Sequence, residues 1–136
     1  MARLEFKQRE NQGILILIPA GRLVLGASDV AFRRRLTSLL RTGRNKLILD
    51  LTDVADIDSA ALGTLILYSL RFREAGGKLV LLHLKHAHAD LPDTLKLNAA
   101  FESYDDEPAA VNSFFPDRAV PHYDILDFVE EQERKR

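Results

Sequence analysis

The chain contains no cysteine among its 136 residues. This absence excludes disulfide bonds, thiolate metal sites and a cysteine nucleophile, and it fits a reducing compartment. A strong net charge is also missing, because 19 Lys and Arg residues oppose 20 Asp and Glu residues to give a formal net charge of -1. No global positive field would therefore attract the chain to nucleic acid or to an anionic membrane, and we expect no direct nucleic-acid partner.

A long uninterrupted hydrophobic run is absent as well. The most apolar stretch, residues 14–25, is broken by Pro19, Gly21 and Arg22. Charged residues also occur among the first seven positions, where a secretory signal requires an apolar stretch. We therefore expect no signal peptide, no membrane insertion and a cytoplasmic location.

Length and composition predict one soluble domain. The sequence is 46% hydrophobic and 29% charged, which is typical of a chain that buries a core and stays dissolved. We assign residues 1–115 to the domain and residues 116–136 to a C-terminal extension with a short amphipathic pattern around residues 125–129. Docking of this extension on its own domain and docking on a partner remain alternatives.

Hydrophobic periodicity predicts the element order ββαβαβαβα, in which a hairpin turn at residues 11–13 opens the chain. The expected strands cover residues 4–6, 14–18, 46–51, 78–84 and 101–104. The expected helices run from Ser28 to Gly43, from Ser59 to Gly76, over residues 87–97 and from residue 105 to Phe114 or Phe115. Strands that alternate with helices after a hairpin indicate an α/β fold with a mixed sheet, because parallel neighbours need a crossover connection. The apolar second strand is expected in the middle of that sheet.

The two longer helices have apolar stripes that predict how they pack. In the first helix, Ser28 is expected as the N-cap, Arg33, Arg34 and Arg41 as a solvated surface, and the buried stripe is Phe32, Leu36, Leu39 and Leu40. In the second helix the expected buried stripe is Leu62, Leu65, Ile66 and Leu70. Three further apolar residues of this helix, Leu67, Tyr68 and Phe72, lie off the stripe and form either a partner surface or a second packed layer.

An acidic segment joins the third strand to the second helix. It contains Asp50, Asp53, Asp56 and Asp58 and ends at Ser59. The free N–H groups at the start of a helix attract negative charge, so an anion on Ser59 would be stabilised there. On position alone, Ser59 is expected as a helix cap, and the aspartates are expected in a solvated loop with side chain to backbone turns.

Catalytic and metal-binding interpretations find less support. Asp56 and Asp58 fit the Asp-x-Asp pattern of some phosphotransferases, but no other strand end supplies the further carboxylates that such an enzyme needs. The histidines His83, His86 and His88 have neither helical i, i+4 spacing nor cysteine partners, and His122 is distant. A Gly-x-Ser-x-Gly elbow and a glycine-rich phosphate loop are both missing. We therefore expect no enzyme activity, no catalytic residue, no metal and no cofactor.

Several short motifs occur in a recognisable order and spacing. They are Gly21-Arg22-Leu23, the strand-to-loop stretch of residues 47–58, Ile57-Asp58-Ser59-x-x-Leu62-Gly63, Ala75-Gly76-Gly77-Lys78-Leu79, and Phe101-Glu102-x-Tyr104-Asp105-Asp106-Glu107-x-Ala109-Ala110. Together they resemble the STAS domain family (sulfate transporter and anti-sigma factor antagonist), and the resemblance extends over residues 4–115.

The resemblance implies an anti-sigma factor antagonist. In soluble members of the family, the serine of the Asp-Ser pair, here Ser59, is phosphorylated by an anti-sigma factor that is itself a serine kinase. The unphosphorylated form binds that anti-sigma factor, phosphorylation ends the binding, and a phosphatase restores it. The expected partner-binding residues are Asp56, Asp58, Ser59, Ala60, Ala61, Leu62, Gly63 and Leu67. The oligomeric state is left open between a monomer and a weak dimer.

One departure from the family pattern keeps a second function open. Many members have Ser or Thr and then Gly after the phosphorylated serine, whereas this chain has Ala60 and Ala61. The missing glycine leaves a methyl group at a position where the backbone would approach a kinase closely. Ser59 is also the only hydroxyl in the motif that could accept a phosphate. The alternative is a STAS scaffold or adaptor in a signalling or transporter complex that is never phosphorylated.

Overall fold

The computed structural model describes residues 4–84 and 101–116. The helix expected at residues 87–97 and all but the first residue of the expected extension lie outside the described residues. The described strands are β1 (Glu5–Asn11), β2 (Ile14–Leu23), β3 (Lys46–Asp50), β4 (Val54–Ile57), β5 (Lys78–Leu82) and β6 (Ser103–Tyr104). The described helices are α1 (Ala27–Arg41), α2 (Ser59–Glu74) and α4 (Glu107–Asn112). None of these three helices combines the length and the apolar character that crossing a membrane requires.

The strands form one mixed six-stranded sheet, which confirms the expected α/β class. The order is β1-β2-β3-β5-β6, and β4 pairs with β2 outside this path. Only β1 runs antiparallel to its neighbour, because Gln12 and Gly13 connect it to β2 in a two-residue turn. Both turn residues have positive φ angles, 53° and 82°, which such a hairpin turn requires.

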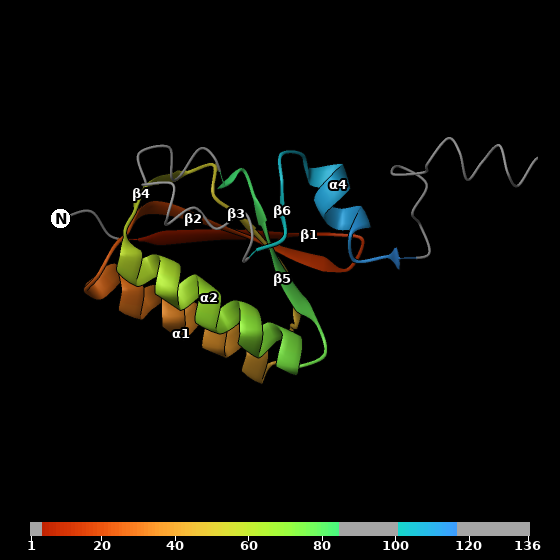
Figure 1. Ribbon diagram of the computed structural model, residues 1–136, viewed down its shortest axis with the longest axis horizontal. Helices are drawn as coiled ribbons and strands as arrows, with labels where there is room; N and C mark the ends of the chain where they lie inside the picture. Colours follow the sequence, from red (N-terminus) through yellow and green to blue (C-terminus); the bar gives the residue numbers. More distant parts are fainter. Residues whose placement is uncertain (1–3, 85–100, 117–136) are drawn as a thin grey trace, which may run out of the picture.

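Strand β2 lies in the middle of the sheet, as expected, and both of its faces are covered. Leu15 and Leu17 point to the layer formed by α1 and α2, whereas Ile14 and Ile16 point to the side of α4. Figure 1 shows α1 and α2 side by side on one face of the sheet and α4 on the other. The result is a three-layer arrangement with two cores separated by the sheet.

Two expectations about this part of the chain were wrong. Residues 21–23, which lie beyond the expected strand of residues 14–18, continue β2, and residues 54–57, expected in an acidic loop, form β4. Gly21 pairs with Val54 of β4, the register then shifts because Ala55 of β4 is an extra residue, and Leu23 pairs with Ile57. Strand β4 has two exposed residues between buried Val54 and Ile57, so its sequence does not alternate as a half-buried strand does.

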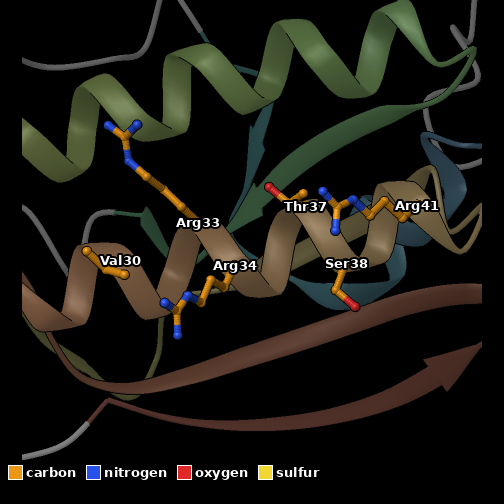
Figure 2. A pocket seen from close by; sticks show the side chains of 6 residues that line it. All are labelled: Val30, Arg33, Arg34, Thr37, Ser38 and Arg41. Atoms are coloured by element: carbon orange, nitrogen blue, oxygen red, sulfur yellow. The ribbon is translucent and has the colours of Figure 1, made fainter.

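Helix α1 buries the expected residues Phe32, Leu36 and Leu39, and Leu40 is partly buried against the same core. The expected cap was wrong, because the residue before the helix is Gly26. The Ser28 hydroxyl instead donates to the carbonyl of Val24 at 2.7 Å. The outward face of α1 carries the exposed arginines Arg33, Arg34 and Arg41, as expected (Figure 2).

In helix α2, Leu62 and Leu65 are buried as expected, but the expected burial of Ile66 and Leu70 was wrong. Ile66 and Leu70 are 42% and 48% exposed, whereas Tyr68 and Phe72 are buried. The helix packs against both β5 and α1, so it needs apolar side chains in two directions and one stripe does not define its inward face. Burial of Tyr68 is accommodated because its hydroxyl lies 2.7 Å from the hydroxyl of Thr37 on α1.

The short helix α4 is attached to β1 through Glu107. Arg9 and Asn11 of β1 both donate to the Glu107 carboxylate, at 2.8 Å and 2.7 Å. The hydrogen bonds from Arg9 outweigh the opposing effect of burial and lower the pKa of Glu107 to about 2. The N-cap of α4 is Asp106, whose side chain accepts from the N–H of Ala109 at 2.8 Å.

Gly77 lies where two connections of the sheet approach each other, and its substitution should be destabilising. A Cβ at this position would be 1.8 Å from the carbonyl oxygen of Asn45, which also accepts from the N–H of Lys78. We expect Gly77→Ala to lower the free energy of unfolding by about 1–3 kcal/mol in urea titrations. The control is Gly63→Ala in α2, where the added methyl group meets nothing within 4 Å. It should raise stability by about 0.5–1 kcal/mol, and equal effects of the two variants would contradict the close approach.

Candidate functional site

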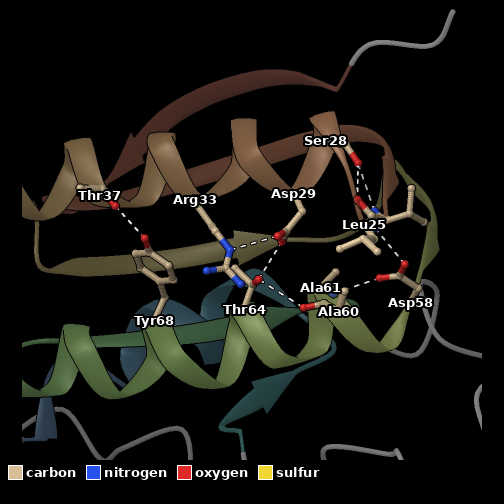
Figure 3. A network of polar contacts seen from close by, with 11 residues as sticks. Leu25, Ser28, Asp29, Arg33, Thr37, Asp58, Ala60, Ala61, Thr64 and Tyr68 are labelled. Atoms are coloured by element: carbon tan, nitrogen blue, oxygen red, sulfur yellow. Dashed lines mark hydrogen bonds and ion pairs between the residues drawn. The ribbon is translucent and has the colours of Figure 1, made fainter.

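The junction between β4 and α2 is organised by the carboxylate of Asp58. It accepts hydrogen bonds from the N–H of Ala61, in the first turn of α2, at 3.0 Å and from the N–H of Leu25, in the β2–α1 connection, at 2.9 Å (Figure 3). The backbone N–H of Asp58 also donates to the carbonyl of Leu23 at 3.1 Å. One residue therefore caps α2 and holds the β2–α1 connection against the start of that helix.

The environment of Asp58 favours its ionised form. Burial alone would raise the pKa of this carboxyl group. The backbone hydrogen bonds from Leu25, Ala61 and Ala60 act in the opposite direction and leave the pKa below its ordinary value. Asp58 is therefore negatively charged at neutral pH and complements the positive end of the α2 dipole.

Ser59 is the first residue of α2 and is exposed. The expectation that it caps the helix was wrong, because Asp58 has that role. The Ser59 hydroxyl makes no hydrogen bond to another residue of the described part of the chain. An incoming group can therefore reach it without breaking a hydrogen bond to residues 4–84 or 101–116, and the N-terminus of the 16-residue helix favours an added negative charge there.

The aspartates of the junction point to separate partners. Asp50 accepts from the backbone N–H and hydroxyl of Thr52 at 3.0 and 2.5 Å, which confirms the side chain to backbone turn, but it is buried at the end of β3, so its expected place in a solvated loop was wrong. Asp56 forms an exposed ion pair with Arg22 at 3.1 Å, and Asp53 is exposed. Within residues 4–84 and 101–116, no three His, Asp or Glu side chains come together as a metal site. His83 follows β5, whereas His86, His88 and His122 lie outside the described residues.

The remaining expected partner-binding residues divide between core and surface. Ala61 and Leu62 are buried, at 0% and 4% exposure, and their side chains belong to the core. Gly63 is exposed, Ala60 is half-buried, and Leu67 is half-buried against the core. The side chains of Ala61 and Leu62 are therefore not accessible at the surface of the domain.

Sequence reasoning missed two exposed apolar residues of this surface, Ile66 and Leu70. They follow Ser59 and Gly63 at the spacing i, i+4, i+7 and i+11, which places all four on one face of the helix. We call Ser59, Gly63, Ile66 and Leu70 the α2 strip. Helical spacing counted from Ser59 would have identified it, whereas spacing counted from the presumed core residues did not.

Polar contacts between α1 and α2 fix which residues of α2 face outward. Buried Asp29 accepts from the Thr64 hydroxyl at 2.7 Å and from Nε of Arg33 at 3.0 Å (Figure 3). Thr64 is fully buried, so rotation of α2 would break its hydrogen bond to the buried Asp29 carboxylate. The network therefore keeps the α2 strip exposed.

The structure shows where the methyl group of Ala61 lies, one of the two residues at which this chain differs from many family members. Ala61 stands where many family members have glycine, and its methyl group is fully buried in the core shared by the sheet and the two long helices. It therefore does not project beside Ser59, and the close approach of another backbone to Ser59 is not obstructed at this position.

Two substitutions of Asp58 should distinguish the contribution of its capping hydrogen bonds to stability from the contribution of its charge. Asp58→Ala removes the acceptor for Leu25 and Ala61 and should lower the free energy of unfolding by about 0.5–2 kcal/mol. Asp58→Asn keeps an acceptor and should lose less. Because the native pKa is lowered, the advantage of the wild-type carboxylate over the Asp58→Asn variant should be present above about pH 4 and should disappear as the pH falls through the native pKa. Urea unfolding at several pH values measures this, and a pH-independent difference would contradict the role of the charge.

Comparisons with known proteins show the same fold. A structure of a candidate anti-sigma factor antagonist from Thermotoga maritima superposes with a TM-score of 0.71 at 24% identity and covers 80% of this chain and 93% of its own. An anti-sigma factor antagonist from Mycobacterium paratuberculosis gives 0.70 at 14% identity, with coverages of 82% and 94%.

The anti-sigma factor antagonist SpoIIAA in its unphosphorylated form gives a TM-score of 0.57 at 17% identity and covers 80% of this chain and 96% of its own. A search of curated proteins found no match. The family model of the STAS domain matches residues 5–110. The chain belongs to the STAS domain family.

Proposed function

We propose that this protein is an anti-sigma factor antagonist that is controlled by phosphorylation of Ser59. The unphosphorylated protein binds an anti-sigma factor with serine kinase activity through the α2 strip and the neighbouring β2–α1 connection. Phosphorylation of Ser59 ends this binding, and a phosphatase reverses it. The protein thereby regulates transcription by a sigma factor in the cytoplasm, and it acts as a substrate and binding switch without an active site of its own.

The single observation that carries the proposal is the accessibility of Ser59 at the start of α2. Its hydroxyl is exposed and makes no bond to another described residue, whereas the neighbouring Asp58 satisfies the helix end. Membership of the STAS domain family and structural neighbours described as anti-sigma factor antagonists support the same function.

Phosphorylation can change recognition without unfolding the domain. The Ser59 oxygen would attack the γ-phosphorus of ATP held by the kinase, ADP would leave, and the hydroxyl proton would pass to a base of the kinase. The product gains about -1.5 to -2 charge at pH 7. The N–H groups at the start of α2 stabilise this charge, whereas exposed Asp56 and the ionised Asp58 add to the negative field that a bound partner would experience.

The exposed apolar residues of the α2 strip supply the binding energy in this proposal. Leu25, in the connection held by Asp58, is 74% exposed and adds a further apolar side chain beside the start of the helix. Exposed apolar groups next to a charged rim are typical of a surface that is covered by another protein.

The first test is phosphate transfer to Ser59. Incubation of the full chain with the anti-sigma factor kinase of the same genome and ATP should add one phosphate, located at Ser59 by mass spectrometry. Ser59→Ala should abolish transfer, whereas the control Ser69→Ala, elsewhere on α2, should accept phosphate normally. Phosphate at another residue would contradict the site, and binding of the kinase without any transfer would favour the scaffold or adaptor function.

A second test addresses the binding surface. Ile66→Ser should weaken binding of the unphosphorylated protein to the kinase about 10-fold or more, since removal of an apolar anchor from an interface removes at least about 1.4 kcal/mol. Calorimetric titration measures this affinity, and urea unfolding checks that the fold is retained. Lys7→Ser on β1, which is exposed and lies outside α2, is the control and should bind normally. Unchanged affinity of Ile66→Ser would exclude the α2 strip as the binding surface.

A further inference from the structure

The outward face of α1 forms a second surface, separate from the α2 strip. It lines an open depression of about 530 Å³ that contains three arginines and three smaller side chains (Figure 2). The lining residues are Val30, Arg33, Arg34, Thr37, Ser38 and Arg41. We call these six residues the α1 face.

The positive charge of the α1 face is largely uncompensated. Arg33 pairs with Asp29 at 3.0 Å. Arg34 and Arg41 are exposed, and neither pairs with a carboxylate in the described part of the chain. Val30 is 49% exposed at one end of the same face. An occupant that fits this face therefore combines carboxylates with apolar side chains.

Residues 124–131 of the same chain have this composition. They contain four carboxylates and no cation, and the remaining four residues are apolar. The carboxylates are Asp124, Asp127, Glu130 and Glu131, and the apolar residues are Ile125, Leu126, Phe128 and Val129. We propose that residues 124–131 dock on the α1 face and pair their carboxylates with Arg34 and Arg41.

The connection is long enough for this contact. Pro116, the last described residue, lines one pocket together with Lys46, and Lys46 begins β3 shortly after α1 ends at Arg41. The eight residues from Pro116 to Asp124 span up to about 26–29 Å when extended. A helix of 15 residues such as α1 is about 22 Å long. The linker is therefore long enough for residues 124–131 to reach the C-terminal part of α1, which ends close to Lys46 in the chain, from their own domain.

Docking within one molecule is favoured over an external acidic partner because the segment is covalently attached. A short tether gives an effective concentration in the millimolar range, so even weak charge pairing is populated. The contact would neutralise the arginines of α1, and it does not involve the α2 strip. It is therefore independent of phosphorylation and of the partner proposed above.

The absence of cysteine allows a direct test in the full chain. Gln132→Cys introduces one thiol next to the segment, and a nitroxide attached there broadens the NMR signals of nearby backbone amides. We expect broadening of the amides of residues 30–41, relative to the chemically reduced label, and none in α4. Added salt should weaken the effect, since the Debye length falls to about 3 Å at 1 M.

Charge reversal identifies the contact. Arg34→Glu combined with Arg41→Glu should abolish the broadening of α1, whereas the control Lys7→Glu combined with Arg73→Glu, with the same change in net charge, should retain it. Asp127→Lys combined with Glu130→Lys tests the same pairing without any change in α1. The amide spectrum of each variant shows whether the fold is retained.

Three results would overturn the proposal. The amides of α1 would be unaffected by the label in the full chain, or the broadening would persist after both charge reversals. Alternatively, the broadening would occur between two molecules, when ¹⁵N-labelled protein without a nitroxide is mixed with spin-labelled protein without ¹⁵N. In that case a second copy of the chain is the occupant. None of these results depends on Ser59 or on an anti-sigma factor, so they leave the proposed function unaffected.

Discussion

Strand β2 is hydrogen-bonded to three other strands, and this pairing fixes both the sheet and the site. Its first part lies between β1 and β3, and its last part, from Gly21 to Leu23, lies along β4. The register of Leu23 with Ile57 places the end of β2 beside the start of α2. The N–H of Leu25 can then reach the carboxylate of Asp58. The site exists because β2 continues beyond its pairing with β1 and β3 and pairs there with β4.

The fold class was predictable because its main elements have strong local patterns. β2 is apolar at successive positions, which indicates burial on both faces, and the hairpin turn contains a glycine where a positive φ is required. β4 was not predictable, because only Val54 and Ile57 are buried and the strand is defined by backbone pairing with β2. The residues that pair with β4, from Gly21 to Leu23, are distant in the sequence, so no local pattern reveals this strand.

The candidate site was predictable in position but not in detail. The sequence places Ser59 where a strand gives way to a helix, yet Asp58 and Ser59 are both good capping residues. Which of them caps the helix depends on where β4 ends. The orientation of α2 is also a tertiary property, because apolar residues occur on more than one side and the buried pair of Thr64 and Asp29 selects the inward side. Exposure of Ile66 and Leu70 follows from that selection.

The attachment of α4 to β1 has a consequence for biosynthesis. Arg9 and Glu107 are 98 residues apart in the chain. At about 5–20 residues per second, Glu107 leaves the ribosome's active site about 5–20 s after Arg9. During that interval β1, an edge strand of the sheet, lacks the helix that binds its side chains. Charged residues such as Lys7, Arg9 and Glu10 along this strand oppose pairing with other nascent chains, and the same arginine later secures the finished domain.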